Sequence, residues 1–231
     1  MQQPVKEEIN HQTIKLLVGV IALSLGSLTD LFADEPLSSI SASYYEGGWS
    51  QTFFVGFLFA IAAFLMAYNG HSKTEMMLAK VAAIAAAGAA MFPCNCPEAV
   101  GNCRTDMALI PGLHGLFAAI LFIILAVFCR LFYQRAGTKA EQGNVEARCR
   151  QFVYVVCGVV IVLSMAWIAL HALTGFLGPR AVFYGETAAL ISFGVSWLTA
   201  SRALPLLAKP DERPWVAPNE QAKAQASKTD R

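Results

Sequence analysis

The chain has 231 residues, of which 56% are hydrophobic and 14% are charged, and its formal net charge is +1. A soluble domain carries about 25% charged residues, and here the apolar residues form long continuous blocks. This composition excludes an ordinary soluble domain and predicts an integral membrane protein. A net charge near zero gives no basis for nucleic-acid binding, so no nucleic-acid partner is expected.

Six apolar stretches are long enough to cross a membrane, which needs about 20 residues of helix. They cover residues 13–33, 51–68, 76–92, 109–132, 152–176 and 182–204. Each stretch is continuous rather than alternating, which favours helices over strands. The first has Glu7 and Glu8 before it and no small-residue cleavage site after it, so it is predicted to be a permanent helix rather than a signal peptide.

The predicted fold class is therefore all-α integral membrane, a six-transmembrane-helix bundle over residues 1–208. Residues 209–231 are rich in Pro, Ala, Gln and charge, a composition typical of a disordered tail. Of the 17 basic residues, Arg104 and Arg180 fall in the first, third and fifth connections, and the other 15 lie on the opposite side. Basic residues concentrate on the cytoplasmic side of membrane proteins. Both ends are thus predicted to be cytoplasmic (N-in/C-in), in a multi-pass protein of the bacterial inner (plasma) membrane whose partners are membrane lipids.

Ionisable residues inside a membrane are costly and mark candidate functional sites. Asp30, His114, His171 and Glu186 belong to four different predicted helices. At 1.5 Å per residue, all four lie within about 10 Å of the outer helix ends. Their shared depth predicts an outward-facing polar pocket. The same residues could instead be helix-end groups that hydrogen-bond to neighbours or lipid headgroups.

The first outer loop, residues 34–50, is acidic, aromatic and rich in serine. Its Ser41 and Tyr44 are expected to lie over the pocket. Its tyrosines and Trp49 are typical of the headgroup zone, where amphipathic rings settle.

Two histidines and a carboxylate also have the chemistry of a metal site. His114, His171 and Glu186 could bind zinc, which could activate water; Asp30 or Ser41 would assist. No His-x-x-x-His pair is present to support this alternative. The two histidines could also ligate haem iron axially, but the chain lacks histidines for the second pair that such cytochromes often carry.

Three cysteines, Cys94, Cys96 and Cys103, lie in the third connection. An outer loop faces an oxidising compartment, so Cys94 or Cys96 is predicted to form a disulfide with Cys103. The remaining thiol could be free or bind a metal.

Several short motifs suggest a family resemblance. They are Ser39-Ile40-Ser41, Tyr44-Tyr45, Phe54-Val55-Gly56, Tyr68-x-Gly70 and Phe92-Pro93. With these motifs the chain resembles small bacterial six-helix membrane proteins of unknown function and is distantly similar to the Frag/DRAM/Sfk group. The resemblance implies a six-helix fold and no established catalytic activity. The clustered outer cysteines depart from that group.

Two functional hypotheses follow. The first is an inner-membrane protein that binds a lipid, a small ligand or a partner at the outward-facing pocket. The alternative is a metal-dependent membrane hydrolase, for which the ceramidase-like hydrolases are a comparison, although this chain lacks their paired His-x-x-x-His. The sequence identifies neither a substrate nor a protein partner.

Overall fold

The computed structural model describes residues 11–95, 110 and 112–208, and the described part contains helices and no strand. Six helices are long and apolar enough to cross a membrane. They are α1 (His11–Leu31), α3 (Gly48–Ala67), α4 (Lys73–Met91), α5 (Leu113–Glu141), α6 (Val145–Thr174) and α7 (Ala181–Ala200). The predicted all-α fold with six candidate spans is therefore confirmed. Three short helices complete the described chain: η1 (Ile40–Ala42), α2 (Ser43–Glu46) and η3 (Pro205–Leu207).

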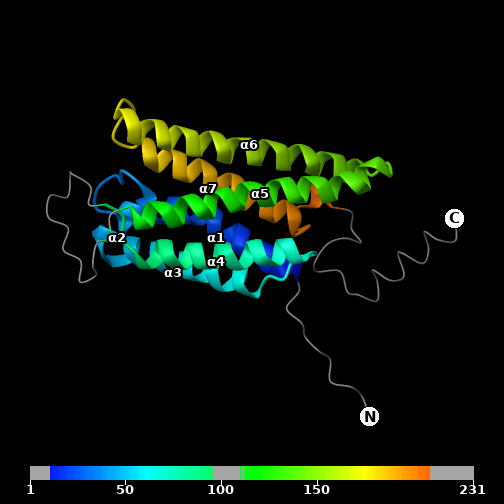
Figure 1. Ribbon diagram of the computed structural model, residues 1–231, viewed down its shortest axis with the longest axis horizontal. Coiled ribbons are helices and arrows are strands. Elements are labelled where there is room, and N and C mark those ends of the chain that lie inside the picture. The colour runs from blue at the N-terminus through cyan, green and yellow to red at the C-terminus, as the bar shows by residue number, and fades with distance from the viewer. Residues whose placement is uncertain (1–10, 96–109, 111, 209–231) are drawn as a thin grey trace, which may run out of the picture.

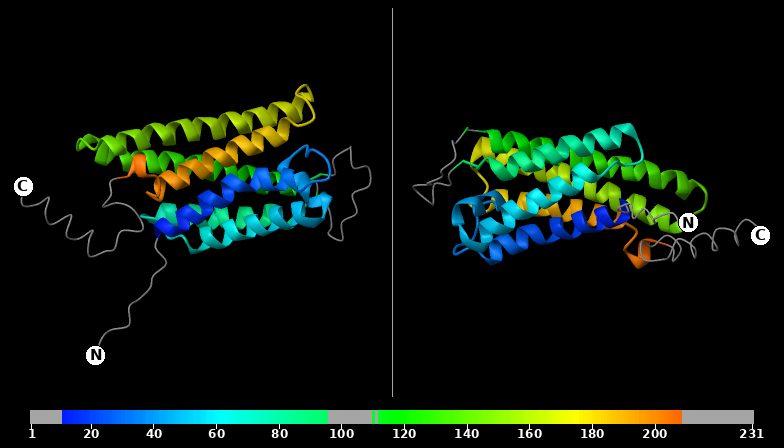
Figure 2. Two further views of the ribbon diagram at one scale, coloured as in Figure 1. Left: turned by 180° about the vertical axis from the view of Figure 1, so that it is seen from behind. Right: turned by 90° about the horizontal axis from the view of Figure 1, so that it is seen from below.

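The six long helices form a closed bundle in which each packs against two neighbours (Figure 1). The order around the bundle is α1, α3, α4, α5, α6, α7 and back to α1, with a smaller contact between α5 and α7. Figure 2 shows the same antiparallel arrangement from behind and from below. Since the number of long helices is even, α1 begins and α7 ends at the same end of the bundle.

The predicted boundaries were wrong where α5 and α6 meet. The predicted stretch 109–132 becomes a helix that starts at Leu113 and continues to Glu141, and the predicted start at residue 152 moves back to Val145. Hydropathy marks the end of an apolar stretch, whereas a helix continues through charged residues until its hydrogen bonds are capped. Here Gly143 has a positive φ of 83°, and the Asn144 side chain caps the first turn of α6 by accepting from the Ala147 N–H at 2.8 Å.

The interior of the bundle contains an aromatic cluster around Trp197, which is fully buried on α7. Its ring centroid lies 5.3–6.0 Å from those of Tyr68, Phe128, Phe132 and Phe193. These distances are typical of favourable aromatic pairs. The cluster joins α7 to α5 and to the end of α3, and so fixes α7, which carries Glu186.

Charge separates the two ends of the bundle. Among the described residues, every Lys and Arg except Arg180 lies toward the end at which α1 begins, here called the basic end. There the buried Glu75 of α4 pairs with Arg135 of α5 and accepts the His71 N–H at 2.6 Å. Burial, followed by the charges of Arg135 and Lys15, lowers the pKa of His71 in the α3–α4 connection to about 4. These contacts tie the α3–α4 connection to α5.

Candidate functional site

At the end opposite the basic end, a cavity of about 560 Å³ lies between α5, α6, α7 and the loop that precedes η1. It is here called the Glu186 cavity. Figure 1 shows α5 and α6 joined at the basic end and spreading apart toward this one. Its polar lining residues are Ser38, Ser39, Ser41, Cys94, Asn95, His114, His171 and Glu186. Four of the six residues predicted from the sequence, Ser41, His114, His171 and Glu186, therefore line one cavity.

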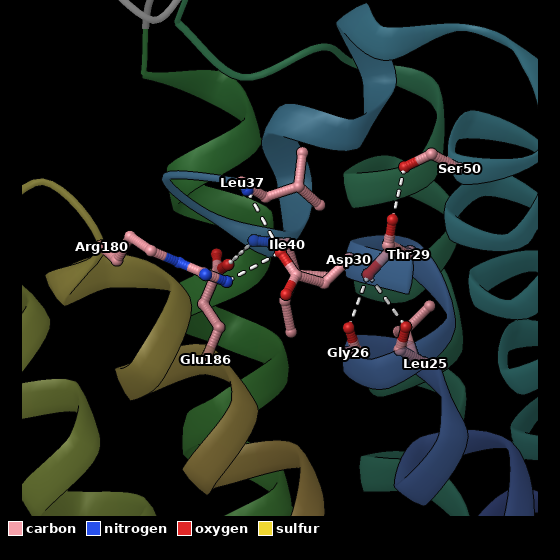
Figure 3. Close-up of polar contacts among 9 residues, drawn as sticks. All are labelled: Leu25, Gly26, Thr29, Asp30, Leu37, Ile40, Ser50, Arg180 and Glu186. Atoms are coloured by element: carbon pink, nitrogen blue, oxygen red, sulfur yellow. Dashed lines mark hydrogen bonds and ion pairs between the residues drawn. The ribbon is translucent and has the colours of Figure 1, made fainter. Parts of the chain in front are cut away.

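Glu186 lies in the second turn of α7 and reaches toward η1 rather than out of the bundle (Figure 3). Its Oε2 accepts the Ile40 N–H at 2.6 Å, and the Ser41 N–H also hydrogen-bonds to the carboxylate. The Ser39 side chain accepts the third N–H, that of Ala42, at 3.0 Å. The N–H groups at the start of a helix lack partners within it and favour a carboxylate. Glu186 thus ties η1 to α7, two elements distant in sequence.

The shared depth of the four ionisable residues predicts that Glu186 faces the bundle interior within reach of His114 or His171, either directly or through one water or ion. The contacts that the structure describes for its carboxylate are instead with backbone N–H groups. Within the described part of the chain neither His114 nor His171 hydrogen-bonds to the carboxylate; the backbone of η1 does. Every residue except proline has a backbone N–H donor. The sequence pattern therefore could not identify the backbone of η1 as the partner of Glu186.

The position of His114 follows from how α4 ends. In a helix the carbonyl of Ala89 would accept the N–H of the residue four positions on, but that residue is Pro93, which has none. His114 supplies the missing donor. Its Nδ1 lies 3.0 Å from the Ala89 carbonyl oxygen and 2.9 Å from that of Phe92. Because both partners are acceptors, Nδ1 carries the proton, and Nε2 of the neutral ring is an acceptor available to a ligand.

His171 is in the last turn of α6 and lines the same cavity. Its Nδ1 is buried and has no hydrogen-bond partner within the described part of the chain. An unpaired buried polar atom costs about 1–3 kcal/mol.

Asp30 and Tyr44 do not line the cavity, but they hold structures at its edge. Asp30 Oδ1 accepts from Arg180 at 2.7 Å and from the Leu37 N–H at 3.1 Å (Figure 3). With the Phe183 N–H donating to the Ser38 carbonyl at 3.0 Å, the loop before η1 is fixed to the start of α7. The sequence did not assign Arg180 a role in the site. The available indication was that Arg180 is one of two basic residues in the first, third and fifth connections, while the other 15 lie on the opposite side.

Tyr44 stacks edge-on against Tyr45, with ring centroids 5.7 Å apart. The Tyr45 hydroxyl donates to the carbonyl of Cys94 at 2.5 Å. The tyrosine pair therefore connects the η1–α2 segment to the chain that follows α4.

Cys94 is a free thiol, so the predicted disulfide from Cys94 is not formed. The described part of the chain contains no disulfide, and Cys96 and Cys103 lie outside the described residues. The Cys94 thiol donates to the Ser41 carbonyl at 3.4 Å. Burial, followed by the charge of Glu186, raises the pKa of Cys94 to about 11. At neutral pH the thiol is protonated and is a weak nucleophile.

The predicted zinc site receives no support. Among the described residues no three His, Cys, Asp or Glu side chains are grouped so that they could hold a metal ion. Similar positions along their helices therefore did not bring His114, His171 and Glu186 into one group that could hold a metal ion.

Comparison of the chain with protein-family models, curated proteins and solved structures found no match. The resemblance to the Frag/DRAM/Sfk group therefore stays a prediction. What the fold defines is the class of protein: six helices suited to crossing a membrane, with a cavity at one end.

Proposed function

We propose that this protein is an integral membrane protein that binds an amphipathic small molecule or lipid in the Glu186 cavity. The proposal rests on the lining of the cavity, which is polar at one end and apolar at the other. Serine, histidine and glutamate side chains are contributed by the loop, by the outermost turns of α5 and α6, and by α7. Deeper along α5 and α6 the lining changes to apolar residues, among them Ala118, Phe122, Met165 and Ile168.

The dimensions and position of the cavity support this function. Ligand sites in proteins commonly have volumes of roughly 300–1,000 Å³, with a mostly apolar lining and a few polar groups that orient the ligand. The cavity volume of about 560 Å³ is in this range. The apolar part of the cavity lies between two helices that are themselves apolar enough to contact lipid. A ligand could therefore enter from the bilayer.

We also propose that the cavity faces outward from the bacterial inner membrane and that both termini are cytoplasmic. The clustering of basic residues at the end where α1 begins supports this orientation. A topology reporter fused after Arg231 should read cytoplasmic, and one inserted near Gly101 should read external. A cytoplasmic reading at Gly101 would contradict the proposed orientation.

Filling the cavity should abolish ligand binding. Ala119 lines the cavity from α5, and in Ala119→Trp the indole should occupy the space of the ligand's apolar part. We expect binding of the preferred probe among dodecylamine, dodecanol and dodecyl phosphate to fall at least about tenfold, equivalent to about 1.4 kcal/mol. Native mass spectrometry of protein in a neutral detergent measures the bound fraction.

The matched control is Leu163→Trp, which places an indole on the surface of α6, where Leu163 is 62% exposed. It should leave probe binding unchanged. Equal binding to both variants would mean that the probes bind elsewhere, and binding of none of the probes to the unmodified protein would reject the proposed function.

A further inference from the structure

The charged part of the described lining of the Glu186 cavity is acidic. Among its described lining residues Glu186 is the single Asp or Glu, and none is Lys or Arg. Arg180 lies outside the lining and is paired with Asp30 at 2.7 Å. A phosphate or carboxylate group in this cavity would lie near a carboxylate without a basic side chain from the described lining to neutralise it. Like charges held close together in a poorly hydrated site repel strongly.

The carboxylate of Glu186 retains hydrogen-bonding capacity. An ionised carboxylate has about four acceptor positions on its two oxygens. The N–H groups of Ile40 and Ser41 occupy two of them. The remaining positions can accept from a ligand without releasing η1.

Other acceptors surround the same space. The proton on Nδ1 of His114 leaves Nε2 of the neutral ring as an acceptor. Ser39 and Ser41 contribute hydroxyl oxygens, which lie 3.1 Å apart, and each hydroxyl can accept. The acceptors come from η1, α5 and α7, three elements that surround the cavity.

We propose that the ligand carries a primary ammonium group that pairs with Glu186. An ammonium group has three N–H donors and no acceptor, which matches a wall of acceptors around a carboxylate. Hydrogen bonds between charged partners are about twice as strong as those between neutral ones. This inference rests on the proposed function and specifies the chemical class of the ligand: an amine with a long apolar chain that continues along Ala118, Phe122, Met165 and Ile168.

The experiment compares probes with the same chain and different polar ends. Dodecylamine, dodecanol and dodecyl phosphate are titrated separately against the full-length protein in a neutral detergent, with the bound fraction read by native mass spectrometry. The amine should bind at least about tenfold more tightly than the alcohol, and the phosphate most weakly. In Glu186→Gln, which keeps an oxygen to accept from Ile40, the preference for the amine over the alcohol should disappear while alcohol binding persists.

Glu35→Gln is the control for loss of a negative charge, since Glu35 is exposed in the same loop and is not among the cavity residues. It should retain the amine preference. Equal binding of amine and alcohol to the unmodified protein would overturn the amine inference and leave the proposed function standing. The same amine preference in Glu186→Gln would also overturn it, because the ammonium would then be recognised elsewhere. If none of the three probes binds, the proposed function itself fails.

An amine could come from a free long-chain amine or from a lipid headgroup. Adding phosphatidylethanolamine, which has a primary ammonium, or phosphatidylcholine, which has no N–H, distinguishes the two sources. Displacement of dodecylamine by phosphatidylethanolamine alone would support recognition of a headgroup amine. Displacement by neither lipid would support a free long-chain amine.

Discussion

Replacing Gly194 by Leu should destabilise the protein by more than about 3 kcal/mol, above the usual 1–3 kcal/mol of overpacking. Gly194 of α7 crosses Gly19 of α1 so closely that a Cβ at position 194 would lie 2.7 Å from Leu23 Cγ and 2.9 Å from the Gly19 carbonyl oxygen. Leu23 could rotate away, but the backbone of Gly19 cannot move unless the two helices separate. Small residues at membrane helix crossings permit such close packing.

Gly56→Leu is the matched control, because a Cβ at Gly56 meets no atom within 4 Å and the residue is exposed on α3. Its free energy of unfolding should not fall, and should rise by up to about 1 kcal/mol because a helix-interior glycine is replaced by a better helix former. The two variants are compared by detergent-induced unfolding. Similar stability of Gly194→Leu and Gly56→Leu would contradict the close crossing of α1 and α7, on which the position of Glu186 depends.

Replacing Arg135 by Met should lower the free energy of unfolding by about 3–5 kcal/mol, the usual cost of removing one partner of a buried ion pair. The side chain of Glu75 is 3% exposed and that of Arg135 is 31% exposed. Methionine fills part of the space but leaves the Glu75 carboxylate without its cation.

A second substitution separates charge from packing. The double variant Arg135→Met/Glu75→Met should recover part of the loss, because the carboxylate that Arg135→Met leaves unpaired is then also removed. Arg148→Met, which removes an exposed Arg from α6, should have little effect. Equal stability of the Arg135 and Arg148 variants would show that the Glu75–Arg135 pair does not stabilise the basic end.

Much of the fold could be predicted from the sequence because lipid requires long apolar helices. The number and order of the helices followed from six apolar stretches. The extension of α5 beyond residue 132 did not, because Arg135 and Lys139 end the apolar stretch without ending the helix. The order in which the helices surround the bundle also could not be predicted, since hydropathy gives the length of a span but not its neighbours.

The candidate site was predictable in part. Depth along the helices grouped His114, His171 and Glu186, which line one cavity, with Asp30, which does not; Ser41, expected from the loop over the pocket, also lines it. Depth gives no information about rotation around a helix axis, so it could not show that His114 turns toward the end of α4 or that Glu186 turns toward η1. Pro93 was the one local indication for His114, because it leaves the Ala89 carbonyl without a helical donor.

Photoaffinity labelling tests most directly whether the Glu186 cavity holds an amphipathic ligand. A long-chain amine bearing an alkyl diazirine is added to membranes containing the full-length protein, irradiated, and the adducts are mapped by mass spectrometry. We predict adducts concentrated at residues 115–122 of α5 and 165–169 of α6, lost in Ala119→Trp and retained in Leu163→Trp. Adducts spread over the lipid-facing surface of α6 and equal in the two variants would contradict a binding function for the cavity.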